Sequence, residues 1–253
     1  MTDGRLAGKT VLISGGASGI GLATACRALT AGAHVAIGDI DVTAGERAAR
    51  DHRGLHFVKL DVVSDASWAQ AVDDVRTRFR RLDGLVNSAG IFVVGDVERL
   101  SLDDWHRTMA VNVDGVFLGC RHGVRAMKDH GGSIVNLSSV SGIVGGHNVI
   151  AYNASKGAVR LLSKSVALHC AKEGYGIRCN SVHPTFVDTP MYQATLGLSR
   201  DPEKMRRALT AQVPLGRVAQ PAEIADAIVY LLSDEAAFVT GSELVIDGGL
   251  TAR

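Results

Sequence analysis

The sequence has little that would direct it to a membrane or to nucleic acid. It contains no apolar run of about 18 residues, the length that a transmembrane helix needs. Its 27 lysine and arginine residues are matched by 26 aspartate and glutamate residues, which leaves a net charge of +1. Binding to a phosphate backbone needs an excess of basic residues, and there is none here. We therefore expect neither a membrane nor a nucleic acid as a partner.

Cysteine is scarce as well. Cys26, Cys120, Cys170 and Cys179 are widely spaced, with no Cys-x-x-Cys pair and no histidine-rich cluster, so no zinc site is expected. This usage favours free thiols buried in a protein of the reducing cytoplasm. Residues Met1 to Lys9 are polar, and we expect no secretory signal there.

What remains is typical of a folded protein. Hydrophobic residues make up 46% of the chain and the mean hydropathy is +0.14, which argues against disorder. No proline-rich, serine-rich or single-charge stretch divides the chain, and no internal repeat is visible. We expect one domain over residues 1–253.

Short β-branched runs alternate with longer segments of helical period, a pattern that predicts parallel strands joined by crossover helices. The expected fold class is α/β, a doubly wound three-layer sandwich around a seven-stranded parallel sheet. The candidate strands are Thr10 to Ser14, His34 to Asp39, His56 to Leu60, Gly84 to Asn87, Ser133 to Ser138, Ile177 to His183 and Glu243 to Ile246. The candidate helices are Ile20 to Ala31, Ser67 to Arg81, Leu102 to Lys128, Ala154 to Lys172 and Ala222 to Leu232.

One segment does not follow the alternation. Thr185 to Pro214 is predicted to be a long irregular connection after the sixth strand. Long loops in compact domains usually serve function, so we interpret residues 185–214 as a substrate loop or lid.

A glycine-rich turn, Ser14 to Gly21, connects the first strand to the first helix. Glycines allow the backbone to approach a pyrophosphate closely, and the N-terminus of the helix stabilises its charge. The turn alone does not identify the ligand, because a methyltransferase could use a similar one. Asp39, at the end of the second strand, can accept hydrogen bonds from both ribose hydroxyls and would repel a 2′-phosphate. Between Lys9 and Asp39 the only cation is Arg27, so NAD is favoured over NADP.

The chemistry is expected where the strands end. The fifth strand leads into Ser139, and the helix that follows presents Tyr152 and Lys156 four residues apart, on one face. An ammonium about 4 Å from the phenol would favour the phenolate by roughly three pKa units. Such a tyrosine could accept a proton near neutral pH.

These residues together resemble the short-chain dehydrogenase/reductase family, over nearly the whole chain. The motifs that carry the resemblance are Gly19-Ile20-Gly21, Asp39, Asp61-Val62, Asn87-Ser88-Ala89-Gly90, Asn112, Ser139, Tyr152-x-x-x-Lys156, His183-Pro184 and Val187-x-Thr189. The stretches Ala154 to Arg160 and Gly241 to Gly249 look like those of bacterial hydroxysteroid and cyclic-alcohol dehydrogenases. The resemblance implies a Rossmann fold and a homotetramer paired through the long helices.

The resemblance also implies roles for individual residues. Tyr152 is the expected acid/base, Ser139 bonds the substrate oxygen, and Lys156 lowers the tyrosine pKa and holds the nicotinamide ribose. Asn112 is expected to anchor a water that relays the proton. The residues expected to bind the cofactor are Gly15, Ser18, Gly19, Ile20, Gly21, Asp39, Ile40, Asp61, Val62, Asn87, Ala89, Gly90, Tyr152, Lys156, Pro184, Val187 and Thr189. Two positions depart from the family pattern, since Ser88 replaces the usual Asn and Thr185 the common Gly.

Three segments should line the substrate site: Gly90 to Val97, Val140 to Ile150 and Pro184 to Ser199. None contains Lys or Arg, which predicts a neutral, mostly apolar secondary alcohol or ketone. The expected substrate contacts are Phe92, Ser139, Val140, Val144, Phe186, Met191 and Tyr192.

Three functions remain open from the sequence. The first is an NAD-linked alcohol or hydroxysteroid dehydrogenase. The second is a 3-oxoacyl or sugar reductase on the same scaffold, and the third is a catalytically silent NAD-binding sensor.

Overall fold

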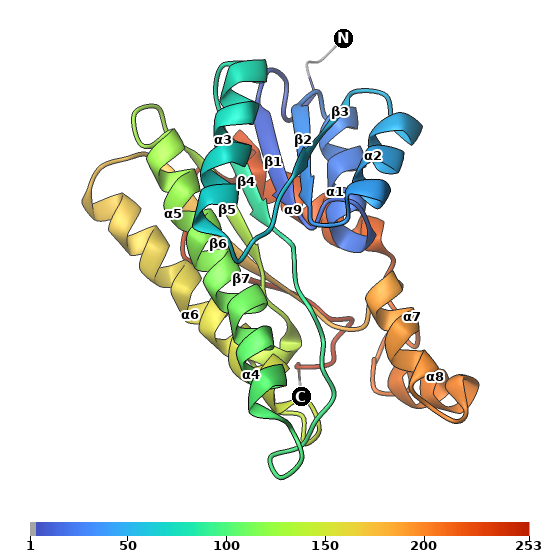
Figure 1. The fold of residues 1–253 in the computed structure, drawn as a ribbon. Coiled ribbons are helices and arrows are strands. Elements are labelled where there is room, and N and C mark those ends of the chain that lie inside the picture. Colours follow the sequence, from blue (N-terminus) through green and yellow to red (C-terminus); the bar gives the residue numbers. More distant parts are fainter. Residues whose placement is uncertain (1–3, 253) are drawn as a thin grey trace.

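The computed structural model describes residues 4–252 and shows a doubly wound α/β fold (Figure 1). Part of the polar N-terminal stretch, residues 1–3, and residue 253 lie outside the described residues. All seven strands are parallel, in the order β3-β2-β1-β4-β5-β6-β7. The fold class and the seven strands predicted from the sequence are confirmed. The strands are β1 (Thr10–Ser14), β2 (His34–Asp39), β3 (Leu55–Lys59), β4 (Gly84–Asn87), β5 (Gly132–Leu137), β6 (Ile177–Pro184) and β7 (Glu243–Ile246).

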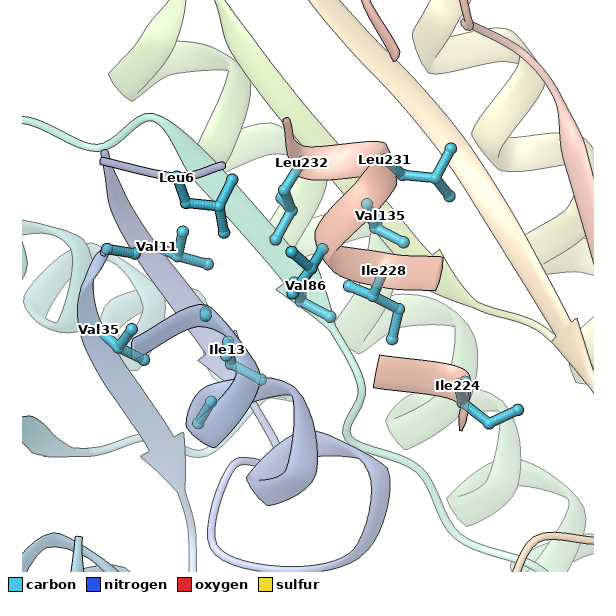
Figure 2. Close-up of a cluster of buried hydrophobic side chains, with 14 of the residues drawn as sticks. Leu6, Val11, Ile13, Val35, Val86, Val135, Ile224, Ile228, Leu231 and Leu232 are labelled. Carbon is cyan, nitrogen blue, oxygen red and sulfur yellow. The ribbon is translucent and has the colours of Figure 1, made fainter. Parts of the chain in front are cut away.

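Helices cover both faces of the sheet. Successive side chains of a strand point to opposite faces, so Val11 and Ile13 of β1 pack in one core cluster and Leu12 in the other. The first cluster joins the strands to α1, α2 and α9, and Figure 2 shows α9 residues Ile224 and Ile228 beside these strands. The second cluster joins them to α3, α5 and α6. The helices are α1 (Gly19–Thr30), α2 (Val42–Asp51), α3 (Asp65–Phe79), α4 (Leu102–Met109), α5 (Gly115–Met127), α6 (Ile150–Lys172), α7 (Pro190–Gly197), α8 (Pro202–Thr210) and α9 (Pro221–Leu232).

The strand order places the site. After β3 the chain returns to the other side of β1, so β1 and β4 are neighbours although two strands separate them in sequence. Ligands of open parallel sheets bind beyond the carboxyl ends of the strands at such a reversal. The glycine turn after β1 and the segment after β4 meet at this point.

The prediction that Thr185 to Pro214 is an irregular connection is wrong, because this segment contains two helices, α7 and α8. Thr189 caps α7 by accepting from the N–H of Tyr192, and Pro190 is the first helical residue. Asp201 caps α8 in the same way, with Pro202 following it. A polar cap followed by proline is a helix-start signal, and both pairs are present in the sequence. Helix α2, capped by Asp41, is also absent from the predicted elements.

The predicted helix from Leu102 to Lys128 is also interrupted. The five residues Ala110–Asp114 form a π-helix between α4 and α5. Such bulges often mark functional sites, and this one contains the buried Asn112. Elsewhere α6 begins at Ile150, four residues before the candidate stretch Ala154 to Lys172, and it carries both Tyr152 and Lys156 as predicted. None of the described helices is long and apolar enough to span a bilayer.

Candidate functional site

The turn after β1 is shaped for a ligand backbone or phosphate. Gly15 and Gly19 have positive φ angles of 65° and 54°, which favour glycine. A Cβ on Gly15 would lie 2.7 Å from the backbone of Ala89, so this residue can only be glycine where β1 and β4 meet. The side chain of Ser18, the N-cap of α1, makes no capping bond to the first-turn N–H groups. Those N–H groups are therefore available to an anion.

Asp39 connects the end of β2 to this turn. Its carboxylate accepts a hydrogen bond from the N–H of Ala17 at 3.1 Å and another from the N–H of Asp41 at 3.1 Å. The next residue, Ile40, is 65% exposed although it is large and apolar. These groups fit a dinucleotide. The Asp39 carboxylate can bind ribose hydroxyls, the exposed Ile40 side chain can contact an aromatic base, and the uncapped N-terminus of α1 can bind phosphate.

Other residues expected around the cofactor lie along the same edge. Thr189 lies against the glycine turn, since a Cβ on Gly19 would be 3.4 Å from its Cγ2. A Cβ on Gly90 would lie 3.3 Å from the amide oxygen of Asn112 and 3.7 Å from Nζ of Lys156. The side chain of Val187 is buried in the core, which leaves only its main chain for a ligand. Asp61 and Val62 follow β3, Pro184 ends β6, and Asn87 lies buried at the end of β4, its amide donating to Asn136.

Tyr152 and Lys156 project from α6 toward the end of β5, where Ser139 lies. The Lys156 ammonium lies 5.5 Å from the centre of the Tyr152 ring and donates to the main-chain carbonyl of Leu137 at 2.7 Å. The Ser139 hydroxyl hydrogen-bonds Tyr152. The three side chains singled out from the sequence therefore form one cluster.

The electrostatics of this cluster differ from the expectation. Burial raises the pKa of Tyr152 to about 12, and the hydrogen bond with Ser139 opposes that rise. Burial also lowers the pKa of Lys156 to about 8. The ammonium donates to the Leu137 carbonyl, and the causes of the Tyr152 pKa shift are burial and the hydrogen bond with Ser139, so the expected lowering by Lys156 is not seen.

Asn112 is tied to the cluster through the main chain. Its amide oxygen accepts from the N–H of Ile91 at 2.8 Å, and its amide nitrogen donates to the Ile91 carbonyl at 2.9 Å. The same nitrogen donates to the Ser155 hydroxyl, which donates in turn to the Tyr152 carbonyl. Asn112 thus joins the segment after β4 to α6 beside Tyr152. Ser155 is not among the residues that the sequence singles out.

The aromatic residues expected to touch substrate each pack against another aromatic ring, whereas the aliphatic ones differ in exposure. Phe92 packs edge-on against Tyr152, with 4.9 Å between the ring centres. Phe186 and Tyr192 pack on each other at 6.5 Å, and the buried Tyr192 hydroxyl has no partner among residues 4–252. The three expected lining segments contain no Lys or Arg, but a cation from α8 lies near one of their residues. The Arg206 guanidinium is 5.9 Å from the centre of the Tyr192 ring. Of the remaining expected contacts, Val140 is buried, whereas Val144 and Met191 are exposed.

Comparison with known proteins agrees with this geometry. The family model described as enoyl-(acyl carrier protein) reductase matches residues 15–251. The chain is 43% identical to an NADP-dependent (R)-specific alcohol dehydrogenase of Lentilactobacillus kefiri, over 100% of both chains. It is 44% identical to a cyclopentanol dehydrogenase of Comamonas testosteroni, over 99% of this chain and 100% of the relative. It is 42% identical to a 3-beta-hydroxysteroid dehydrogenase of the same species, over 97% of each.

The buried Lys156 makes stability depend on pH. Its pKa falls from 10.5 to about 8 on folding, so between these values the unfolded chain holds a proton that the folded chain lacks. The free energy of unfolding therefore rises with pH through this window. At neutral pH the buried charge costs up to about 3 kcal/mol. We expect Lys156→Met to be more stable than the wild type at pH 7 and to lose this advantage as the pH rises from 8 to 10.

Urea unfolding of both proteins across this pH range measures the difference. Lys172→Met, at the exposed end of the same helix, corrects for the general effect of removing a lysine. A stability difference for Lys156→Met that does not change with pH contradicts the prediction.

Proposed function

The chain belongs to the short-chain dehydrogenase/reductase family, and from this we propose that it is an NAD-dependent oxidoreductase of neutral, mostly apolar secondary alcohols and ketones. Cyclic alcohols and 3- or 17-hydroxysteroids are the substrate types that we favour. The observation that carries the proposal is the cluster of Ser139, Tyr152 and Lys156 where β5 ends. We place the protein in the cytoplasm, in keeping with its four free thiols.

Each residue of the cluster has a role at a stated atom. Bound NAD supplies the hydride acceptor for alcohol oxidation, or as NADH the donor for ketone reduction. Tyr152 is protonated at neutral pH because its pKa is raised, and in the reductive direction it donates this proton to the substrate oxygen. In the oxidative direction the phenolate form of Tyr152, after its own proton has left, accepts the proton of the alcohol. The Ser139 hydroxyl donates to that oxygen as negative charge develops on it. Lys156 would hold the nicotinamide ribose, and Asn112 would anchor the water that relays the proton.

Asp39 is the basis for proposing NAD. The relative from Lentilactobacillus kefiri is NADP-dependent, so membership of the family leaves the choice open. A 2′-phosphate beside the Asp39 carboxylate would be repelled, and Arg27, the only cation between Lys9 and Asp39, pairs with Asp226 at 2.9 Å. No basic clamp is then supplied from this stretch.

The proposed substrate is neutral because the first contact with the reacting centre is apolar. Phe92 covers one side of Tyr152, and the three lining segments carry no cation. Residues 185–214, with α7 and α8, form the proposed lid. A 3-oxoacyl or sugar reductase is the alternative on the same scaffold. A non-catalytic NAD sensor is disfavoured, because pure binding does not require Ser139 to bond Tyr152.

We also propose a homotetramer, on the basis of two apolar surfaces. Phe117 of α5 and Leu161 and Leu168 of α6 are exposed, beside a hollow of about 430 Å³ between these helices. A second surface is formed by the fully exposed Phe238 and by β7, the edge strand, whose Val245 is exposed. Large apolar side chains in such number favour contact with further copies of this chain.

A substrate panel tests the proposed reaction. We expect NADH formation, followed at 340 nm, with cyclopentanol, cyclohexanol or hydroxysteroids, and little with sugars or 3-hydroxyacyl thioesters. Tyr152→Phe should lower kcat by about 10²-fold to 10⁴-fold while NAD binding persists, because only the acid/base hydroxyl is lost. Tyr175→Phe, a tyrosine packed on His169, is the control. A wild type that binds NAD but turns over nothing favours the sensor, and a preference for thioesters or sugars favours the alternative reductase.

Cofactor choice is tested at Asp39. Asp39→Asn removes the charge that bonds the ribose hydroxyls, and such bonds contribute about 1.5 to 3 kcal/mol. The KM for NAD should therefore rise about tenfold or more, and the ratio of kcat/KM for NADP over NAD should increase. Asp41→Asn, which alters the cap of α2 two residues away, should leave this ratio unchanged. If the wild type already prefers NADP, the assignment of NAD is wrong.

Light scattering tests the assembly. We expect four times the mass of one chain for the wild type and a smaller particle for the double variant Leu161→Glu, Leu168→Glu, because two buried carboxylates oppose association. Leu198→Glu, an equally exposed leucine after α7, should keep the wild-type mass. A wild-type monomer at micromolar concentration contradicts the tetramer.

A further inference from the structure

His183 is a fully buried histidine directly behind Ser139. It lies next to the end of β6, and both of its ring nitrogens have partners. Nδ1 is 3.1 Å from the main-chain carbonyl oxygen of Ser139, and Nε2 is 2.8 Å from the hydroxyl oxygen of Ser181. The ring therefore bridges the sixth strand to the residue that bonds Tyr152.

The partners determine the tautomer. A carbonyl oxygen can only accept, so Nδ1 carries the proton and donates it to Ser139. The Ser181 hydroxyl then donates to Nε2. Burial lowers the pKa of His183, which keeps the ring neutral at pH 7. The charged groups that face it are Lys156 and Arg160 of α6 and Glu243 of β7, and Arg160 and Glu243 pair with each other at 2.7 Å.

The residue after His183 holds the other end of Ser139. The Ser139 hydroxyl donates to the Pro184 carbonyl at 3.3 Å and accepts from the N–H of Ser141 at 3.1 Å. His183 and Pro184 thus hold the main chain and the side chain of one serine. The hydroxyl that donates to Pro184 is the same group that hydrogen-bonds Tyr152.

We propose that His183 is a positioning residue for this reaction, its Nδ1–H holding the Ser139 main chain so that the Ser139 hydroxyl meets the reacting oxygen. The inference rests on the proposed function, since it assigns His183 to the same Ser139 and Tyr152. An imidazole is costly to bury, and an apolar side chain would fill the space without that cost. In this structure both ring nitrogens of His183 form hydrogen bonds, and the bond of Nδ1 is to the Ser139 carbonyl.

Two variants separate positioning from packing. The amide nitrogen of His183→Asn lies near the place of Nδ1 and can donate to the Ser139 carbonyl, whereas the longer His183→Gln places its amide near Nε2. We expect His183→Gln to lower kcat about tenfold or more, since small displacements of a reacting group are costly. KM for the alcohol and NAD affinity should stay within about twofold, and His183→Asn should keep most of the wild-type kcat.

The pH profile of alcohol oxidation gives a readout that general loosening of the core does not move. Ser139 lowers the pKa of Tyr152, so a displaced Ser139 leaves that pKa higher. The rise of kcat with pH should move to higher pH in His183→Gln and stay in place in His183→Asn. Lys156 and Phe92, the other groups against Tyr152, are unchanged in both variants.

Tyr152→Phe, measured in parallel, separates the two ideas. If Tyr152→Phe is inactive while both His183 variants keep the wild-type kcat and pH profile, the positioning role is wrong and the proposed reaction stands. The role is also wrong if His183→Asn and His183→Gln lose the same fraction of kcat and the pH profile does not move. The loss would then not depend on whether a donor to the Ser139 carbonyl is present. If Tyr152→Phe keeps the wild-type activity, the proposed function itself fails.

Discussion

The site depends on one hydrogen bond, which the buried ammonium of Lys156 donates to a main-chain carbonyl. It crosses from α6 to the carbonyl of Leu137, the last residue of β5, and so ties the helix that carries Tyr152 to the strand that leads into Ser139. A charge removed from water needs such a partner. The main-chain carbonyl of Lys156 is bonded as well, by the hydroxyl of Ser138. The distance between the proposed acid/base and the serine is thereby set by main-chain geometry rather than by a flexible loop.

Burial gives the same cluster its acid/base properties. It raises the pKa of Tyr152 and lowers that of Lys156, because both charged forms lose their hydration. The protein therefore holds the tyrosine protonated at neutral pH, the state that the proposed reduction of a ketone needs. The hydrogen bond with Ser139 lowers the Tyr152 pKa and so opposes the effect of burial. The position of this one hydroxyl therefore affects the Tyr152 pKa. At the end of β6, the His183 ring bonds the main-chain carbonyl of Ser139, and the Pro184 carbonyl accepts from the Ser139 hydroxyl.

Much of the fold could be predicted because its signals are local. Strands buried on both faces appear as apolar runs, and all seven strands lie within one residue of their predicted bounds at each end. One error was made although the signals for the correct structure are local. The predicted loop contains α7 and α8, although Thr189-Pro190 and Asp201-Pro202 are helix starts. The π-helix has no comparable local signal, and the bonds of Asn112 to Ile91, 21 residues earlier, join segments that spacing along the chain does not connect.

The sequence by itself determined which chemical groups are present and in what order. Gly15 to Gly21, Asp39, Ser139 and the pair Tyr152 and Lys156 are recognisable because spacing along a strand end or one helical turn is a local property. The tertiary structure alone decided the environment of those groups. It turned Lys156 toward Leu137, placed His183 behind Ser139 and brought Arg206 over Tyr192. The physical reason is that burial and hydrogen bonding between distant segments set pKa values and orientation, and neither can be read from spacing along the chain.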